Sequence, residues 1–319
     1  SISPLSSSIT AIGNEGVINT LTNNGSIRGD IAVTCAALSL DCDAVRKGSG
    51  RINTLNNSGT INGDVYLGMN APTPGALPSI GTLNNSGSIN QIYLQYLAGE
   101  GVAIETLNNN GYILNGIYIN YIGSDVQAGI GTLVNSGSID GGIHINSITS
   151  PYFSSAGIKS FINTGTITGG IDIGNILYYG QVQSGIQSLT NLGAIAGGIA
   201  VSSISSGSTG IGTLNNLQGG ATGLPLAYSG MLPTNYNIII NGSSNYGRLA
   251  ITSPSGSTNF GIYAGSTLVK GTYSSVLTGI TASNLAGTYS GNYNGFTWGL
   301  NNSSGDIWDL VVFSATKGL

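Results

Sequence analysis

Charged side chains are scarce in this chain: Asp, Glu, Lys and Arg make up 6% of the 319 residues, and the formal net charge is −4. Nucleic-acid binding needs a basic stripe, which 8 basic side chains do not provide, so we expect no nucleic-acid partner. No apolar run approaches the ~20 residues of a membrane-spanning helix, and we expect no transmembrane segment in this chain. One histidine and two cysteines also leave few metal ligands, so we expect neither a metal nor a cofactor.

The two cysteines, Cys35 and Cys42, lie close together in the longest segment between repeated phrases. Two thiols with no histidine nearby form an incomplete zinc set, whereas a local disulfide suits an exported protein. We therefore predict a Cys35–Cys42 disulfide. The chain begins with Ser1 rather than Met, which we interpret as the start of a processed, exported protein.

What the chain has in abundance is glycine, 52 residues, and a recurring phrase, Ile-x-Thr-Leu-x-Asn-x-Gly-x-Ile. The phrase recurs at steps of 24 to 34 residues, a period that is typical of solenoid proteins. Its leucine-like positions are Leu21, Leu55, Leu83, Leu107, Leu133, Phe161, Leu189 and Leu214.

Within each phrase apolar and polar residues alternate, which indicates β-strands with one buried and one exposed face. Glycine-containing bends, such as Asn62-Gly63-Asp64, separate the strands. We predict an all-β fold, a parallel β-helix (β-solenoid) of about 7–8 coils over residues 1–219. Stacking at about 4.8 Å per coil gives a rod of roughly 40 Å.

Stacked coils would align like residues into columns. The leucines would fill the core, and an asparagine column would form a hydrogen-bonded ladder, because an amide both donates and accepts. The glycine of each phrase would occupy a corner that needs either positive φ or close backbone approach. The asparagine column is Asn23, Asn57, Asn85, Asn109, Asn135, Asn163, Asn191 and Asn216.

After Leu214 the phrase does not return, and we expect residues 220–319 to form a β-rich C-terminal cap on the solenoid. Asn241-Gly242 predicts a hairpin between residues 236–240 and 247–252, and a second hairpin is expected over residues 295–313. Trp298 and Trp308 lie in this second hairpin, where we expect them to anchor the core of the cap.

The chain resembles the passenger region of bacterial autotransporters (type V secretion). The phrase Thr-Leu-Asn-Asn-Ser-Gly-Ser-Ile at residues 82–89 is typical of their β-helical passengers. The stretches Tyr-Gly-Arg-Leu-Ala-Ile at 246–251 and Trp-Asp-Leu-Val-Val at 308–312 resemble the segment that precedes the translocator in that family. The resemblance implies an exported protein, extracellular or on the bacterial outer-membrane surface, and often an adhesin.

The candidate partner-binding residues form a column on the exposed side of the second half of the coil. The alternation places Tyr66, Tyr93, Tyr118 and His144 in this column, followed by Asp172. Tyr96 and Tyr121 would form a parallel column. Stacked tyrosines either stabilise the sheet or provide a contact surface for a sugar or a second protein, and both interpretations stay open.

Catalysis finds little support in the sequence. His144 and Asp172 lack a nucleophile that the sequence identifies, and no Gly-x-Ser-x-Gly motif occurs. The twelve carboxylates are scattered, and the one aligned pair, Asp30 and Asp64, would repel each other or share a cation such as calcium. We expect no enzyme, and we expect Asp30 and Asp64 to hold no resident metal.

The sequence therefore predicts a non-enzymatic extracellular or cell-surface protein, an adhesive or scaffolding β-solenoid passenger. Its partner would be a glycan or protein on a host or neighbouring cell, contacted at many weak sites along the rod. A self-assembling extracellular fibre or sheath subunit, whose partner is the chain itself, is the alternative, because low charge reduces repulsion between copies. A carbohydrate-active β-helix enzyme is a third possibility.

Overall fold

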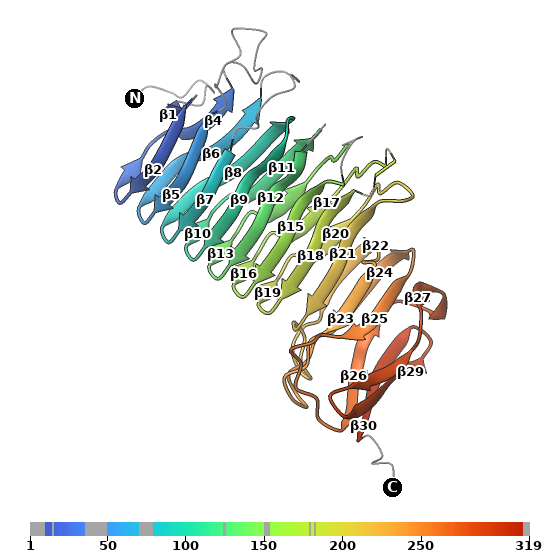
Figure 1. Cartoon of the computed structure of the whole chain (residues 1–319). Coiled ribbons are helices and arrows are strands. Elements are labelled where there is room, and N and C mark those ends of the chain that lie inside the picture. Colours follow the sequence, from blue (N-terminus) through green and yellow to red (C-terminus); the bar gives the residue numbers. More distant parts are fainter. Residues whose placement is uncertain are drawn as a thin grey trace.

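In the computed structural model the strands wind around one axis, and successive coils follow each other along a rod from the N-terminal to the C-terminal end (Figure 1). The structure describes residues 10–14, 16–35, 50–69, 79–123, 126–149, 154–178, 180–181 and 183–314. The chain is all-β, a parallel β-solenoid of about eight turns, as the sequence predicts. The described residues contain one short 3-10 helix, η1 (Ala282–Asn284), and no helix with the length and apolarity needed to cross a membrane.

One broad face of the rod is a sheet of eleven parallel strands. Each of the eight coils that carry the repeated phrase contributes one strand, and three shorter strands continue the sheet beyond them. Leu55 pairs with Leu83 and Leu83 with Leu107, so the repeated phrases lie in register. These strands are β2 (Val17–Asn23), β5 (Arg51–Asn57), β7 (Ser79–Asn85), β9 (Gly101–Asn109), β12 (Val126–Asn135), β15 (Ala156–Asn163), β18 (Ser184–Asn191), β21 (Thr209–Asn216), β23 (Asn235–Ile238), β25 (Thr258–Ile262) and β27 (Leu285–Ala286).

In most coils the rest of the chain forms a short strand of two residues, a bend and a second, longer strand. The short strands are β3 (Ser26–Ile27), β10 (Tyr112–Ile113), β13 (Ser138–Ile139), β16 (Thr166–Ile167) and β19 (Ala194–Ile195). The longer strands are β1 (Thr10–Asn14), β4 (Asp30–Cys35), β11 (Ile117–Ile122), β14 (Ile143–Ile145), β17 (Ile171–Ile173), β20 (Ile199–Val201), β22 (Leu226–Met231) and β24 (Leu249–Ser255). Strands β6 (Thr60–Met69) and β8 (Ser88–Leu97) each span the positions of the short strand and of the longer strand in their coils.

The core is a set of stacked aliphatic columns that fill the inside of the coil. The leucine positions from Leu55 to Leu214 are almost completely buried, as are the isoleucines of the facing strands, such as Ile92 and Ile117. Burial of each such side chain contributes roughly 1.5–3 kcal/mol before the conformational entropy of ordering is subtracted. The rod therefore has a continuous hydrophobic interior.

The predicted asparagine ladder is present at the corner that follows this broad sheet. From Asn23 to Asn216 each Nδ2 donates to the Oδ1 of the next coil's asparagine over 2.7 to 3.1 Å. The same amides also donate to backbone carbonyls, as Asn57 does to Ser88. The ladder therefore satisfies buried polar groups and ties each bend to the coil that follows.

The glycine column works by close approach rather than by positive φ. A Cβ at each of these glycines would lie 2.0 to 2.1 Å from the carbonyl oxygen of the glycine in the preceding coil. Their φ angles are all outside the left-handed region. Close backbone approach, and not a positive φ, therefore explains why glycine occupies this column. The six glycines are Gly59, Gly87, Gly111, Gly137, Gly165 and Gly193.

The row of two-residue strands ends at β19 because the side chain of Gln218 takes the place of the next strand. The Oε1 of Gln218 accepts from the backbone N–H of Ile195 at 2.8 Å and from Nδ2 of Asn191 at 3.3 Å. The Gln218 amide thus replaces a peptide group of the missing strand, and an exposed strand end is covered.

The predicted hairpin between residues 236–240 and 247–252 is present only as a tight turn, in which Ile240 and Tyr246 form one antiparallel bridge and the N–H of Gly247 donates to the carbonyl oxygen of Ile239 at 2.9 Å. The two strands do not pair with each other. Strand β23 pairs in parallel with β21 and β25, and β24 pairs in parallel with β22. The parallel coils continue because Tyr236 and Phe260 extend the core column of Leu214. Aromatic side chains fill the space that leucine fills in the earlier coils, so the repeated phrase is lost while the winding persists.

The second predicted hairpin is confirmed. Strand β29 (Phe296–Ser304) pairs antiparallel with β28 (Ser290–Tyr293) and with β30 (Ile307–Ser314), which also pairs antiparallel with β26 (Gly271–Thr278). Trp298 and Trp308 are both buried, as expected. Trp298 contacts the ring of Phe260 edge-on with centroids 5.7 Å apart, and Nε1 of Trp308 donates to the carbonyl of Ile280 at 3.0 Å.

Two expectations are not decided by this architecture. The Cys35–Cys42 disulfide falls outside the part of the chain whose side chains are described. The division into domains 1–219 and 220–319 stays a prediction, since strands on both sides of residue 219 pair in parallel and the first strand with an antiparallel partner strand is β26.

Candidate functional site

The structure brings the four predicted contact residues together on the outer surface of adjacent strands. Tyr66 of β6 pairs with Tyr93 of β8, Tyr93 with Tyr118 of β11, and Tyr118 with His144 of β14. Ring centroids are separated by 5.9, 6.2 and 4.5 Å along this series. All four side chains are half-buried, so their outer parts face solvent. We call these four residues the aromatic column.

The rings in the aromatic column stand on edge. Coils are spaced by about 4.8 Å, which is too little for aromatic rings to lie flat beside one another. The Tyr66–Tyr93 and Tyr118–His144 pairs therefore stack, while the rings of Tyr93 and Tyr118 are tilted by 49°. The ring of Tyr66 leans along its own strand over Gly68, where a Cβ would lie 2.9 Å from the tyrosine hydroxyl oxygen. The column therefore presents ring edges and hydroxyl groups to solvent, with the ring faces turned toward each other.

A second pair of tyrosines lies three residues further along β8 and β11. The rings of Tyr96 and Tyr121 stack at 4.6 Å with an interplanar angle of 10°. Thr149 Oγ1 donates to the Tyr121 hydroxyl at 2.6 Å. The Tyr66 hydroxyl donates to Gln95 Oε1, between the two sets of rings. The surface around the tyrosines thus carries several hydrogen-bonding hydroxyl and amide groups.

The hydroxyls of Tyr66 and Tyr96 stay protonated over a wide pH range. Burial raises the pKa of Tyr66, and the neighbouring Tyr93 raises it further. Burial likewise raises the pKa of Tyr96, with additional contributions from Tyr121. Both hydroxyls are therefore neutral donors at physiological pH.

His144 ends the aromatic column with both ring nitrogens engaged. Nδ1 lies 3.1 Å from Oδ2 of Asp172, and Nε2 lies 3.0 Å from the carbonyl oxygen of Gly141. A general base in acyl transfer needs one ring nitrogen directed at a hydroxyl or thiol nucleophile. The geometry of His144 instead fixes the imidazole against Tyr118, consistent with a positioning role for Asp172.

Asp30 and Asp64 lie close together, as the sequence predicts, but the predicted bend over residues 62–64 is instead a register shift within the continuous strand β6. Oδ1 of Asp30 accepts from the backbone N–H of Asp64 at 2.8 Å, and Oδ1 of Asp64 accepts from Nδ2 of Asn90 at 2.9 Å. Burial raises the pKa of Asp64, the bond from Asn90 lowers it, and the charge of Asp30 raises it. Among the described residues no three His, Cys, Asp or Glu side chains gather as metal ligands.

The sequence reasoning missed a second polar surface, on the outer face of the broad sheet. Asn56, Asn84 and Asn108 follow the core leucine in three successive phrases and pair in register. They border an open groove of about 290 Å³ that runs over the corner of these coils. Its lining residues are Asn24, Asn56, Asn57, Ser58, Asn84, Asn85, Ser86, Asn108 and Asn110. The signal was available as the doubled asparagine, Leu-Asn-Asn, in those phrases.

Comparisons with protein-family models, with curated proteins and with solved structures find no match to this chain. The fold class, a parallel β-solenoid, therefore rests on the strand pairing itself. That fold is consistent with a passenger-like structural protein. The placement of Tyr66, Tyr93, Tyr118 and His144 on one face is confirmed, whereas their role in binding stays a prediction.

Proposed function

We propose that the chain is a non-enzymatic β-solenoid of the autotransporter-passenger type that acts outside the cell or on the outer-membrane surface in adhesion or scaffolding. The observation that carries this proposal is the aromatic column, four rings held in register on a rigid sheet. Its hydroxyl groups and outward ring edges suit a hydrogen-bonding partner, a glycan or protein of a host or neighbouring cell. Contacts repeated along the rod would add through multivalency.

Support for a non-enzymatic role comes from how the polar groups are used. Both nitrogens of His144 face oxygen atoms of the protein, and Asp30 and Asp64 accept hydrogen bonds from neighbouring groups of the protein. Glycoside hydrolysis needs two carboxyl groups that face each other across a substrate. A test for reducing-sugar release from a polysaccharide panel would detect the carbohydrate-active alternative.

The decisive experiment replaces Tyr66, Tyr93 and Tyr118 together by serine. Small residues already occupy the same column in other coils, at Ala32 and Ala200, so the backbone tolerates them. We expect weaker attachment of purified protein to host cells or extracellular matrix, with the circular-dichroism spectrum retained.

The matched control is Tyr112→Ser, which removes a 58% exposed tyrosine of β10 that lies outside the aromatic column. This control is expected to attach like the wild type. Unchanged attachment of the triple variant, with its fold intact, would remove the aromatic column from the proposal.

The fibre alternative is weakened at one end of the rod. Stacking of copies end to end would need a free coil edge at both ends. At the C-terminal end of the described residues the antiparallel strands β28, β29 and β30 lie beyond β26 (Figure 1). Electron microscopy of the purified protein separates the two functions, since separate rods favour the adhesin and regular filaments favour the fibre.

A further inference from the structure

The outer asparagines form a second ladder, which runs in the opposite direction to the buried one. Nδ2 of Asn84 donates to Oδ1 of Asn56 at 2.9 Å, and Nδ2 of Asn108 donates to Oδ1 of Asn84 at 2.9 Å. An amide has two N–H donors and two acceptor sites. Asn84 therefore keeps one donor and one acceptor site free, and the ladder ends leave the Asn56 amino group and the Asn108 carbonyl oxygen without another described partner.

The opposite wall of the groove is equally polar and uncharged. It consists of the exposed side chains of Asn24, Ser58, Ser86 and Asn110 at the bend. Ser58 Oγ donates to Oδ1 of Asn24 at 2.7 Å. The buried asparagines beneath are occupied by their own ladder. No charged or aromatic side chain lines the groove.

This pattern defines the chemistry of a ligand. Donor and acceptor sites recur at every coil, about 4.8 Å apart, over the roughly 10 Å from Asn56 to Asn108. A sugar hydroxyl both donates and accepts, so a row of hydroxyls complements such a row of amides. An anionic ligand would find no cation in the groove, and an apolar ligand would leave the amides unpaired.

We propose that this groove binds a neutral polysaccharide chain lying along the axis of the rod. The proposal rests on the proposed adhesive function and names its partner class, but it assigns the contact to the broad sheet rather than to the aromatic column. Because no charge takes part, binding is insensitive to added salt.

The test uses the full chain and immobilised neutral polysaccharides, a mannan, an α-glucan and a β-glucan. In a loss variant Asn56, Asn84 and Asn108 are all replaced by valine. The fold already accepts such residues there, since the same column continues as Val134 and Ile162 in the next two coils. We expect binding at least about tenfold weaker, because three hydrogen-bonding amides are lost.

A gain variant, Val134→Asn with Ile162→Asn, extends the amide row from three coils to five. Both side chains face solvent at least in part, so polar replacements are compatible with folding. We expect this variant to bind the same polysaccharide more tightly than the wild type. Loss in the first variant and gain in the second together would establish the site.

The proposal is overturned if the wild type retains none of these polysaccharides, or if the valine variant binds as the wild type does. The serine variant of the aromatic column distinguishes the two proposals. If that variant loses attachment to cells while the valine variant keeps it, the adhesive function survives at the tyrosines and the groove is excluded. If the valine variant alone loses binding, the groove is the contact surface and the aromatic column is excluded.

Discussion

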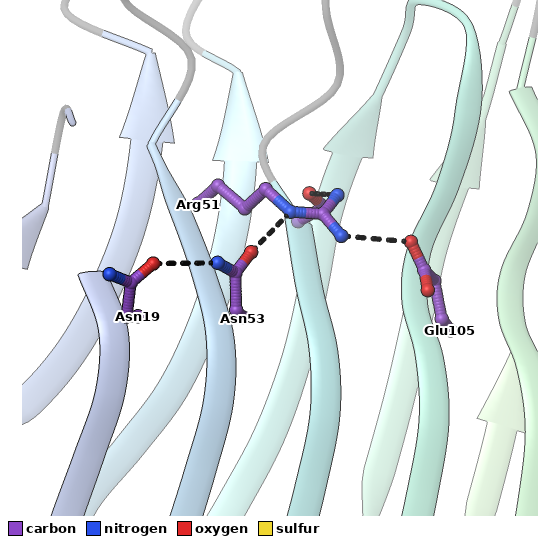
Figure 2. Close-up of polar contacts among 5 residues, drawn as sticks. Asn19, Arg51, Asn53 and Glu105 are labelled. Carbon is purple, nitrogen blue, oxygen red and sulfur yellow. Dashed lines mark hydrogen bonds and ion pairs between the residues drawn. The ribbon is translucent and has the colours of Figure 1, made fainter. Parts of the chain in front are cut away.

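Nη2 of Arg51 lies 3.1 Å from Oε1 of Glu105, although these residues belong to β5 and β9 and a whole coil lies between them. Figure 2 shows the guanidinium extending across the intervening strand toward the carboxylate. A Cβ at Gly81 of that strand would lie 3.5 Å from Nη2, an ordinary contact distance, but only 2.6 Å from the carbonyl oxygen of Asn53, so this glycine permits the close approach of the two strands. Arg51 also donates to Asn53 and Ser79, so one side chain links three coils on the outer surface.

The Arg51–Glu105 pair is expected to contribute modestly to stability. The two side chains are 40% and 54% exposed, which limits the Coulombic gain. A double-mutant cycle with Arg51→Met and Glu105→Gln should give a coupling of about 0.2–1 kcal/mol. The coupling should shrink as salt is added, because exposed charges are screened. Urea denaturation of the four proteins measures it, and a coupling of zero at low salt would contradict the expectation.

The buried asparagine ladder should matter much more to stability than the outer one. Asn135→Ala removes bonds to Asn109 and Asn163 in the interior, at an expected cost of about 1–3 kcal/mol for each neighbouring group left unsatisfied. Asn84→Val is the matched control, because its ladder is half exposed and its column contains Val134. Unfolding free energies from urea titration compare the two. Equal losses would show that burial does not set the cost.

The register of the coils could be predicted from the sequence because strand alternation and a fixed phrase together determine which residues stack. Tyr93 lies over Tyr66, and His144 over Tyr118, for this reason alone. The buried asparagine ladder followed from the same argument, since amides aligned in a column have one another as partners. These features depend on backbone geometry, which the repeat specifies.

The features that could not be predicted depend on side-chain conformation or on a change of residue type. The ring of Tyr66 lies over Gly68, and Arg51 reaches across β7 to Glu105, and the repeated phrase specifies neither arrangement. The parallel coils beyond residue 219 were missed because Tyr236 and Phe260 replace leucine in the core column. A pattern defined by leucine and asparagine cannot detect a coil whose core has become aromatic.

The glycine column permits a direct test of close backbone approach. In Gly137→Ala the new Cβ would lie 2.1 Å from the carbonyl oxygen of Gly111, so the coils must separate. We expect a loss of about 1–3 kcal/mol in unfolding free energy, as for overpacking in a core. Gly25→Ala is the control, because nothing lies within 4 Å of its Cβ position and its φ is not positive.

For the control we expect no loss and a gain of up to about 1 kcal/mol, because alanine restricts the unfolded chain more than glycine. Thermal denaturation followed by circular dichroism compares both variants with the wild type. A destabilised Gly25→Ala variant would show that the glycine requirement arises from backbone conformation and not from contact between coils.

Asp64 should make the protein less stable as the pH rises. Its pKa is raised in the folded chain, chiefly by burial, so the folded state holds the proton more tightly than the unfolded state, where the pKa is about 3.9. Unfolding then releases a proton, and stability falls as the pH rises above about 3.9. Asp64→Asn removes this dependence and keeps an oxygen that accepts from Asn90.

The expected result is a variant that equals the wild type below about pH 3.9 and is more stable at neutral pH. The difference should stay below about 1 kcal/mol, because the side chain is only half-buried and solvent screens its interaction with Asp30. Urea titrations at a series of pH values measure it. An Asp64→Asn variant that is less stable than the wild type at neutral pH would mean that the carboxylate stabilises this part of β6, in contradiction to the raised pKa.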